Sequence, residues 1–77
     1  MQLEDIPLPL REHFEQTTNV LGGKLRLRET RISVEQVLEL LKAGVTAPEI
    51  VESFPSVTPE AVHAVERLAA HCALATL

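Results

Sequence analysis

The chain has 77 residues, one cysteine, two phenylalanines, no tyrosine or tryptophan, and a formal net charge of −4 at pH 7. This length allows one domain with a small aliphatic core and leaves too little chain for the cleft of an enzyme. A single cysteine excludes an internal disulfide framework, and the negative charge argues against tight non-specific binding of nucleic acid.

Residues 1–16 show no regular hydrophobic period, because Pro7 and Pro9 interrupt the apolar positions. Proline fixes φ and restricts the residue before it, which favours an extended N-terminal arm over a helix. Such an arm could fold back over the domain or reach onto a partner. Glu4 and Asp5 stand where a secretory signal carries basic residues, and no apolar run approaches a membrane span. We therefore expect a cytoplasmic protein without membrane contact.

Residues 17–77 are expected to form one domain that begins with a β-hairpin. Residues 17–21 are rich in strand formers, Gly22-Gly23 supplies a two-residue turn, and residues 24–28 alternate in polarity. Leu25 and Leu27 would then face the core, and the cations between them would face solvent. Together with one arginine just beyond the strand, they form the basic row: Lys24, Arg26, Arg28 and Arg31.

Three helices are predicted after the hairpin, each with its own start signal. Their expected N-caps are Ser33, Thr46 and Thr58. Gln36 would complete a capping box at the first helix, Gly44 would end it in a left-handed conformation, and Pro55 would end the second. Apolar stripes at helical spacing follow the caps: Val34, Val37, Leu38 and Leu41; Ala47, Ile50, Val51 and Phe54; and Ala61, Val62, Val65, Leu68, Ala69 and Cys72.

The second and third predicted helices have the proportions of a helix-turn-helix unit joined by residues 54–57. The positions that would face DNA are Ser56, Thr58, His63 and Arg67. A recognition helix usually presents Arg, Lys, Asn or Gln near its start, whereas this one presents Glu60 after an acidic second helix. Tight DNA binding by the isolated chain is therefore not expected, although binding as a dimer or complex stays open.

The C-terminal run from residue 68 is apolar nearly all round, and a helix of that kind is usually buried on more than one side. In so small a domain the second side would belong to another chain, so we expect a homo-oligomer. The alternatives are a contact with another protein and a frayed tail. The interface residues would be Leu68, Cys72, Leu74 and Leu77.

Catalytic and metal-binding patterns are not recognisable. No serine or cysteine stands at a readable spacing from a histidine and an acid, and no phosphate loop is present. His63 and His71 would lie about 12 Å apart along one helix, too far to share a metal ion. We expect a binding protein with no cofactor and no metal.

The stretch from Val20 to about Leu68 resembles domain-of-unknown-function family 433, a small prokaryotic family. The residues that match its pattern are Gly22, Gly23, Thr30, Arg31, Ile32, Val34, Val37, Leu38, Leu41, Gly44, Glu49, Ile50, Pro55, Thr58 and Glu60. Leu25 replaces a proline of the pattern, and Phe54 and Val57 are mild changes. Glu29 replaces a glycine, which puts in doubt a bend expected before Thr30 and Arg31.

The resemblance implies a mainly α fold, a homeodomain-like three-helix helix-turn-helix domain preceded by a short β-hairpin. It further implies a VapB-type antitoxin role in a toxin–antitoxin system, in which the protein binds and silences a PIN-like ribonuclease toxin. The pair could also repress its own promoter by binding operator DNA. The alternatives are a stand-alone dimeric helix-turn-helix transcriptional regulator and an assembly adaptor with neither partner.

Three interpretations of the basic row remain open at this point. It could be a solvated strand face with local ion pairs, a contact for an acidic protein surface, or a contact for DNA phosphates. Arg31 has the sharpest individual case because it matches the family pattern. Its structural alternative is pairing with a carboxylate that pins the hairpin to the first helix.

Overall fold

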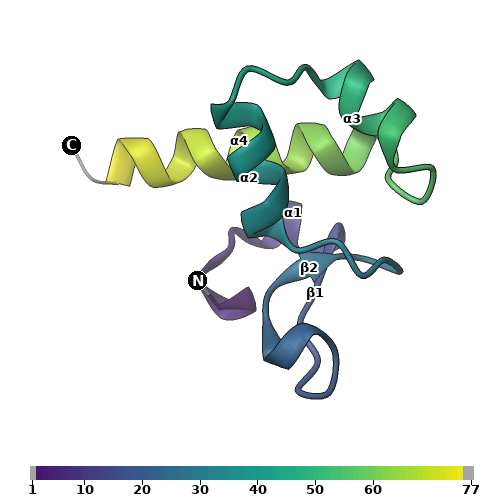
Figure 1. The fold of residues 1–77 in the computed structure, drawn as a ribbon. Helices are drawn as coiled ribbons and strands as arrows, with labels where there is room; N and C mark the ends of the chain where they lie inside the picture. Colours follow the sequence, from purple (N-terminus) through teal and green to yellow (C-terminus); the bar gives the residue numbers. More distant parts are fainter. Residues whose placement is uncertain (1, 76–77) are drawn as a thin grey trace.

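In the computed structural model the backbone is described for residues 2–75 and the side chains for residues 2–71. This part of the chain is mainly helical and contains one short antiparallel strand pair, as expected (Figure 1). The elements, in chain order, are a 3₁₀ turn Leu3–Asp5, α1 Leu8–Arg11, β1 Phe14–Glu15, a 3₁₀ turn Leu21–Gly23, β2 Arg26–Leu27, α2 Val34–Lys42, α3 Ala47–Ser53 and α4 Pro59–Ala75.

The three helices predicted from their start signals are present as α2, α3 and α4. Each predicted cap oxygen accepts a backbone N–H three residues later, at 3.0 Å for Ser33, 3.4 Å for Thr46 and 3.2 Å for Thr58. These bonds satisfy N–H groups that have no partner inside the helix. Gly44 follows α2 with a φ of 92°, the left-handed conformation expected of it. The local signals therefore place all three helix starts correctly.

The strand pair differs from the predicted hairpin. β1 is Phe14–Glu15, and residues 17–21 are not a strand; Phe14 lies opposite Leu27, and Glu15 lies opposite Arg26. Residues 17–21 offer no apolar side chain at alternate positions until Val20, whereas Phe14 supplies a buried partner for Leu27. Gly22-Gly23 consequently belongs to a turn within a longer connection, where Leu21 and both glycines have positive φ.

The other side of β2 is closed by a second tight turn, residues 28–31, which we call the 28–31 turn. The N–H of Leu27 donates to the carbonyl of Ile32 at 2.9 Å, and the hydroxyl of Thr30 donates to the carbonyl of Leu27 at 2.8 Å. Glu29 has a φ of 61° in this turn, a conformation that favours glycine. The bend that the family pattern assigns to a glycine is thus present here with a glutamate.

Residues 2–16 are folded onto the domain and do not form an extended arm. Both prolines fall where a helix tolerates them, since Pro7 is the N-cap of α1 and Pro9 lies in its first turn. Ile6, Leu10 and Phe14 are buried in the main core. The missing hydrophobic period therefore reflects several short elements that each bury one side chain, which a search for a single helix does not detect.

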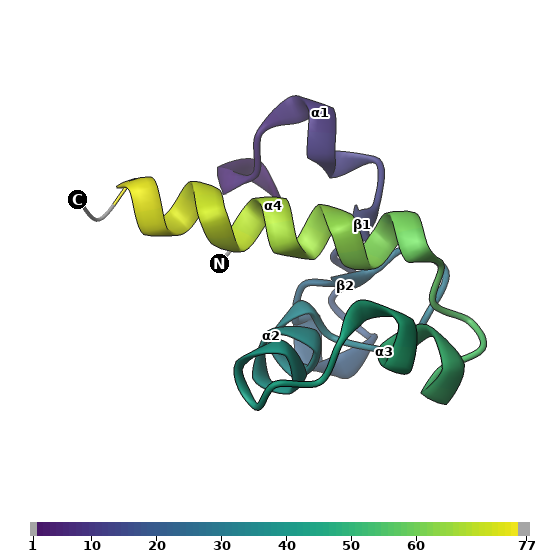
Figure 2. The same cartoon turned by 90° about the horizontal axis from the view of Figure 1, so that it is seen from above.

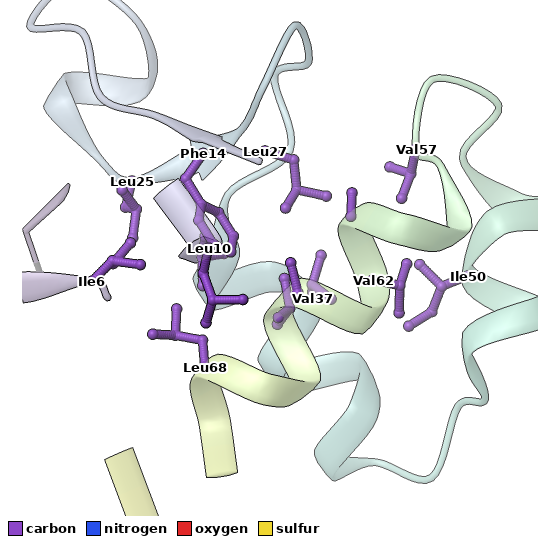
Figure 3. Close-up of a cluster of buried hydrophobic side chains, with 14 residues drawn as sticks. Ile6, Leu10, Phe14, Leu25, Leu27, Val37, Ile50, Val57, Val62 and Leu68 are labelled. Carbon is purple, nitrogen blue, oxygen red and sulfur yellow. The ribbon is translucent and has the colours of Figure 1, made fainter. Parts of the chain in front are cut away.

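α4 runs between the N-terminal segment on one side and α2 and α3 on the other (Figure 2). Ala61, Val62, Ala64, Val65 and Leu68 of α4 are all buried. In Figure 3, Leu10 points toward Leu68, and Ile6 lies by Leu25. The N-terminal segment thus covers one side of α4 as far as Leu68, whereas most of the apolar run expected to be buried on a second side lies outside the described side chains.

None of the helices within residues 2–75 combines the length and apolar character that crossing a membrane requires.

Candidate functional site

The basic row does not form one exposed surface, because Arg26 is buried. Its side chain is 9% exposed, and its Nη1 lies 2.7 Å from a carboxylate oxygen of Glu15, directly across the strand pair. The guanidinium also donates to the carbonyl of Thr30 at 3.2 Å and to the hydroxyl of Thr17 at 3.1 Å. Its Nε is buried and has no hydrogen-bond partner among the described residues. The expectation that Arg26 faces solvent is therefore wrong.

Arg26 links three segments that are separate in sequence, namely β1, the connection after it and the 28–31 turn. A guanidinium presents five donors in a planar fork, so one side chain can bind a carboxylate, a hydroxyl and a carbonyl at once. Pairing with Glu15 and these additional hydrogen bonds offset the cost of removing the guanidinium from water. The pinning function that we considered for Arg31 belongs to Arg26, although Arg26 pins the strands and not the first helix.

Two other cations of the row are exposed but also paired within the chain. Arg28 Nε lies 3.4 Å from Glu15, and Lys24 Nζ lies 3.7 Å from Glu35 on α2. Ion pairs of this exposure contribute little to stability, but they reduce the positive potential that a phosphate or acidic partner would meet. For Lys24 and Arg28 the interpretation as a solvated face with local ion pairs is therefore supported.

Arg31 is the exception in the row. It is exposed at the end of the 28–31 turn, and no carboxylate of the described residues lies within 4.0 Å of its guanidinium. The backbone around it is held firmly, because the Thr30 hydroxyl accepts the N–H of Ile32 at 3.1 Å while donating within the turn. Arg31 is thus an exposed cation with no carboxylate partner among the described residues, on a turn that is closed by hydrogen bonds.

The 28–31 turn borders a shallow, open hollow that reaches the connection between α3 and α4. Its lining residues are Glu15, Val20, Arg26, Glu29, Thr30, Arg31 and Ser56. The hollow therefore brings Arg31 together with Ser56, a residue predicted to face DNA, from segments 25 positions apart in the sequence. This juxtaposition is the candidate site, and we call it the turn hollow.

The remaining residues predicted to face DNA are exposed on α4 but are partly engaged. The Thr58 hydroxyl accepts the N–H of Ala61 as the helix cap, and His63 Nδ1 lies 3.1 Å from Glu66. Arg67 is exposed and has no ion pair with the described carboxylates. Of the four residues predicted to face DNA, Ser56 and Arg67 therefore form no side-chain hydrogen bond or ion pair with the part of the chain that the structure describes.

One of the four residues predicted to form a C-terminal interface, Leu68, is a core residue. Leu68 is 1% exposed and packs in the core of its own chain, so it cannot contribute to an interface without unfolding. Cys72 and Leu74 lie within α4, but their side chains fall outside the described residues, as does Leu77 altogether.

The residues that sequence reasoning missed are Glu15, Thr17 and Thr30 in their roles as ligands of Arg26. Thr30 was recognisable only as part of the family pattern, and Glu15 lies in what was expected to be an arm. A cross-strand carboxylate is visible only when the register is known, so no local signal could have identified it. Among the described side chains, no group of three or more His, Cys, Asp or Glu residues could hold a metal ion.

A sequence model of the family described as "Protein of unknown function (DUF433)" matches residues 15–69. The matched region begins at Glu15 and contains the ion pairs of Glu15 with Arg26 and Arg28. It also contains the 28–31 turn, α2, α3 and most of α4. The core residues Ile6, Leu10 and Phe14 precede it. No curated protein and no solved structure matches the chain.

Proposed function

This chain belongs to the DUF433 family, and on that premise we propose that it is an antitoxin-like protein-binding module that silences a PIN-like ribonuclease. The role is one of binding and not of catalysis. The contact would be made by the turn hollow, with Arg31 inserted toward the carboxylates that hold metal ions in such nucleases.

The observation that carries this proposal is the contrast between Arg31 and the rest of the basic row. Arg26, Arg28 and Lys24 are paired within the chain, whereas Arg31 is exposed, unpaired among the described residues and held on a turn closed by hydrogen bonds. A guanidinium matches a carboxylate in a bidentate geometry, and a rigid mount lowers the entropy cost of binding. These properties suit an arginine that enters an acidic site on another protein.

DNA binding by the isolated chain has a specific observation in its favour and a stronger one against it. Ser56 and Arg31 both line the turn hollow, and Arg67 is exposed on α4, so the chain offers a hydroxyl and two cations to a phosphate. However, the surface of α3 and α4 also exposes Glu49, Glu52, Glu60 and Glu66, which would repel a phosphate backbone. A stand-alone dimeric transcriptional regulator is therefore our second candidate.

One pair of variants separates the two candidates. The protein would be co-expressed with the product of the neighbouring gene and purified through a tag on one partner. We expect Arg31→Ala to weaken capture by at least about tenfold, because truncating one member of a desolvated charge pair costs on the order of 2 kcal/mol or more. Arg67→Ala, which removes an exposed arginine outside the turn hollow, should leave capture unchanged.

Salt-dependent retention of the isolated protein on a DNA duplex, lost in Arg67→Ala, would instead support the regulator. Equal capture of the nuclease by wild type and Arg31→Ala would overturn the proposed contact. Growth rescue by the same variants, in cells that express the nuclease, gives an independent measurement.

A further inference from the structure

The turn hollow contains a feature that the proposed function leaves unexplained, a glutamate in a conformation that suits glycine. Glu29 has a φ of 61°, and for an L-residue other than Asn or Asp this conformation carries a steric cost. The Glu29 side chain is exposed and forms none of the hydrogen bonds or ion pairs present among the described residues. Glu29 therefore forms no contact among the described residues that offsets the steric cost of its backbone conformation.

The charges around the turn hollow show what Glu29 does there. The other carboxylate of the hollow, Glu15, lies 2.7 Å from Arg26 and 3.4 Å from Arg28, so its charge is neutralised locally. Because Glu15 carries one negative charge against two guanidinium groups, this cluster keeps a net positive charge. Glu29 and Arg31, on either side of Thr30, have no ion pair among the described residues, so Glu29 is the lining carboxylate whose charge is not countered. The hollow thus presents a negative and a positive group next to each other.

We propose that Glu29 is a specificity-determining residue, a carboxylate that excludes phosphodiester backbones from the turn hollow and reserves Arg31 for a protein surface of mixed charge. Without Glu29, the hollow would combine a free arginine with the hydroxyl of Ser56 near the start of a long helix, which is an arrangement that attracts phosphate. A polynucleotide is negative everywhere, so it meets repulsion from Glu29 wherever it approaches Arg31.

A protein partner can satisfy both charges, because it can place a cation opposite Glu29 beside the carboxylate that receives Arg31. A metal-dependent nuclease suits this description, because carboxylates hold its metal ions and cations contact the RNA backbone. This part of the inference rests on the proposed function, whereas the exclusion of phosphate does not.

The test compares two variants that make the same change in net charge. Glu29→Gln removes the carboxylate from the turn hollow, and Glu39→Gln removes an exposed carboxylate from α2, outside the hollow. Binding of each isolated protein to a fluorescently labelled DNA duplex would be measured by anisotropy across a low-salt series. We expect Glu29→Gln to bind about threefold to tenfold more tightly than Glu39→Gln, with a salt dependence steeper by about one phosphate contact.

The double variant Glu29→Gln/Arg31→Ala shows whether the gain passes through Arg31. The proposal requires this variant to bind DNA no more tightly than Glu39→Gln/Arg31→Ala, the control with the same net charge. It is overturned if Glu29→Gln and Glu39→Gln bind DNA equally, or if the gain persists without Arg31. Circular dichroism of every variant confirms that the fold is retained.

The same variants keep the two proposals apart. If the neighbouring gene product binds, Glu29→Gln should lower its affinity while raising that for DNA, and a merely destabilised fold would not produce opposite changes. If no nuclease binds but DNA affinity rises through Arg31, the proposed function fails and the role of Glu29 in excluding phosphate stands.

Discussion

Arg26 illustrates how a charged residue in a small domain can serve the fold and not a partner. Its guanidinium is joined to Glu15, Thr17 and Thr30, so it ties the two strands and the 28–31 turn together. Arg28 shares the same carboxylate but is 59% exposed. These two arginines therefore form a matched pair for mutation, with one partner and two very different degrees of burial.

We expect Arg26→Lys to lower the free energy of unfolding by about 2 kcal/mol, because lysine cannot reproduce the planar fork. The loss should fall below the roughly 3–5 kcal/mol of a fully buried pair, since Glu15 is 31% exposed and keeps Arg28. Arg28→Lys should change stability by no more than about 0.5 kcal/mol. Urea denaturation of both variants is the measurement, and equal losses would contradict the assignment of Arg26 as the link.

The left-handed conformation of Glu29 leads to a second prediction at the level of a single residue. We expect Glu29→Gly to raise the free energy of unfolding by about 0.5–1 kcal/mol, because relief of the steric cost exceeds the added entropy of the unfolded chain. The midpoint temperature of thermal unfolding should then rise by roughly 2–8 °C in a domain of this size. Glu29→Ala removes the same carboxylate but keeps Cβ, so it should give no such gain; a gain equal to that of glycine would argue against strain.

At the level of elements, the N-terminal segment belongs to the core of the domain although it lies outside the family match. The family match begins at residue 15, yet Ile6, Leu10 and Phe14 before it are buried in the same core as α2 and α4. Hydrogen bonds hold the segment in place: the Gln16 side chain accepts the N–H of Leu3 at 3.0 Å and donates to the carbonyl of Gly23 at 3.0 Å. In this chain the segment therefore completes the domain.

Two leucines of α1 test this conclusion within one turn of helix. Leu10 is 5% exposed, whereas Leu8 is 74% exposed. We expect Leu10→Ala to cost about 2–4 kcal/mol, a large share of the roughly 4–12 kcal/mol available to a 77-residue chain. Leu8→Ala should cost less than about 0.5 kcal/mol. If chemical denaturation found Leu10→Ala as mild as Leu8→Ala, the segment would be only loosely attached.

The elements also show which local signals were sufficient. Ser33, Thr46 and Thr58 cap their helices as predicted, because a cap depends on residues within four positions of each other. The first strand was predicted at residues 17–21, whereas β1 is Phe14–Glu15. Its position depends on the pairing of Phe14 with Leu27, thirteen residues away. Sequence patterns predict contacts of the first kind far better than those of the second.

At the scale of the whole molecule, the described chain has a radius of gyration of 11.8 Å. A compact chain of this length is expected near about 11.5 Å, so the N-terminal segment does not extend the particle. The C-terminal turns of α4 project past the other elements in both views (Figures 1 and 2). Beyond Arg67 the sequence contains no charged side chain except the ionisable His71. Because such an apolar end favours contact with a second chain, self-association through this end stays a prediction.

Sedimentation velocity tests that prediction. We expect the wild-type chain to sediment as a homo-oligomer and Leu74→Glu to sediment as a monomer, because a buried unpaired carboxylate at an interface is costly. His71→Glu, an exposed position one turn earlier, provides a control for the added charge. A monomeric wild type at high concentration would contradict self-association, and an unchanged oligomer in Leu74→Glu would place the interface elsewhere.

The sequence alone determined the helical character of this protein, the three helix starts, the inward faces of Leu25 and Leu27, and its family. Those features depend on periodicity and on capping groups within a few residues. Only the tertiary structure decided that Arg26 is buried, that Arg31 stays free, that Leu68 belongs to the core, and that residues 2–16 complete the domain. The first, third and fourth of these outcomes depend on contacts between residues more than ten positions apart, whereas the second is the lack of an ion pair for Arg31 among the described residues. The strand register and fold-back that bring distant residues together are not encoded in any local pattern.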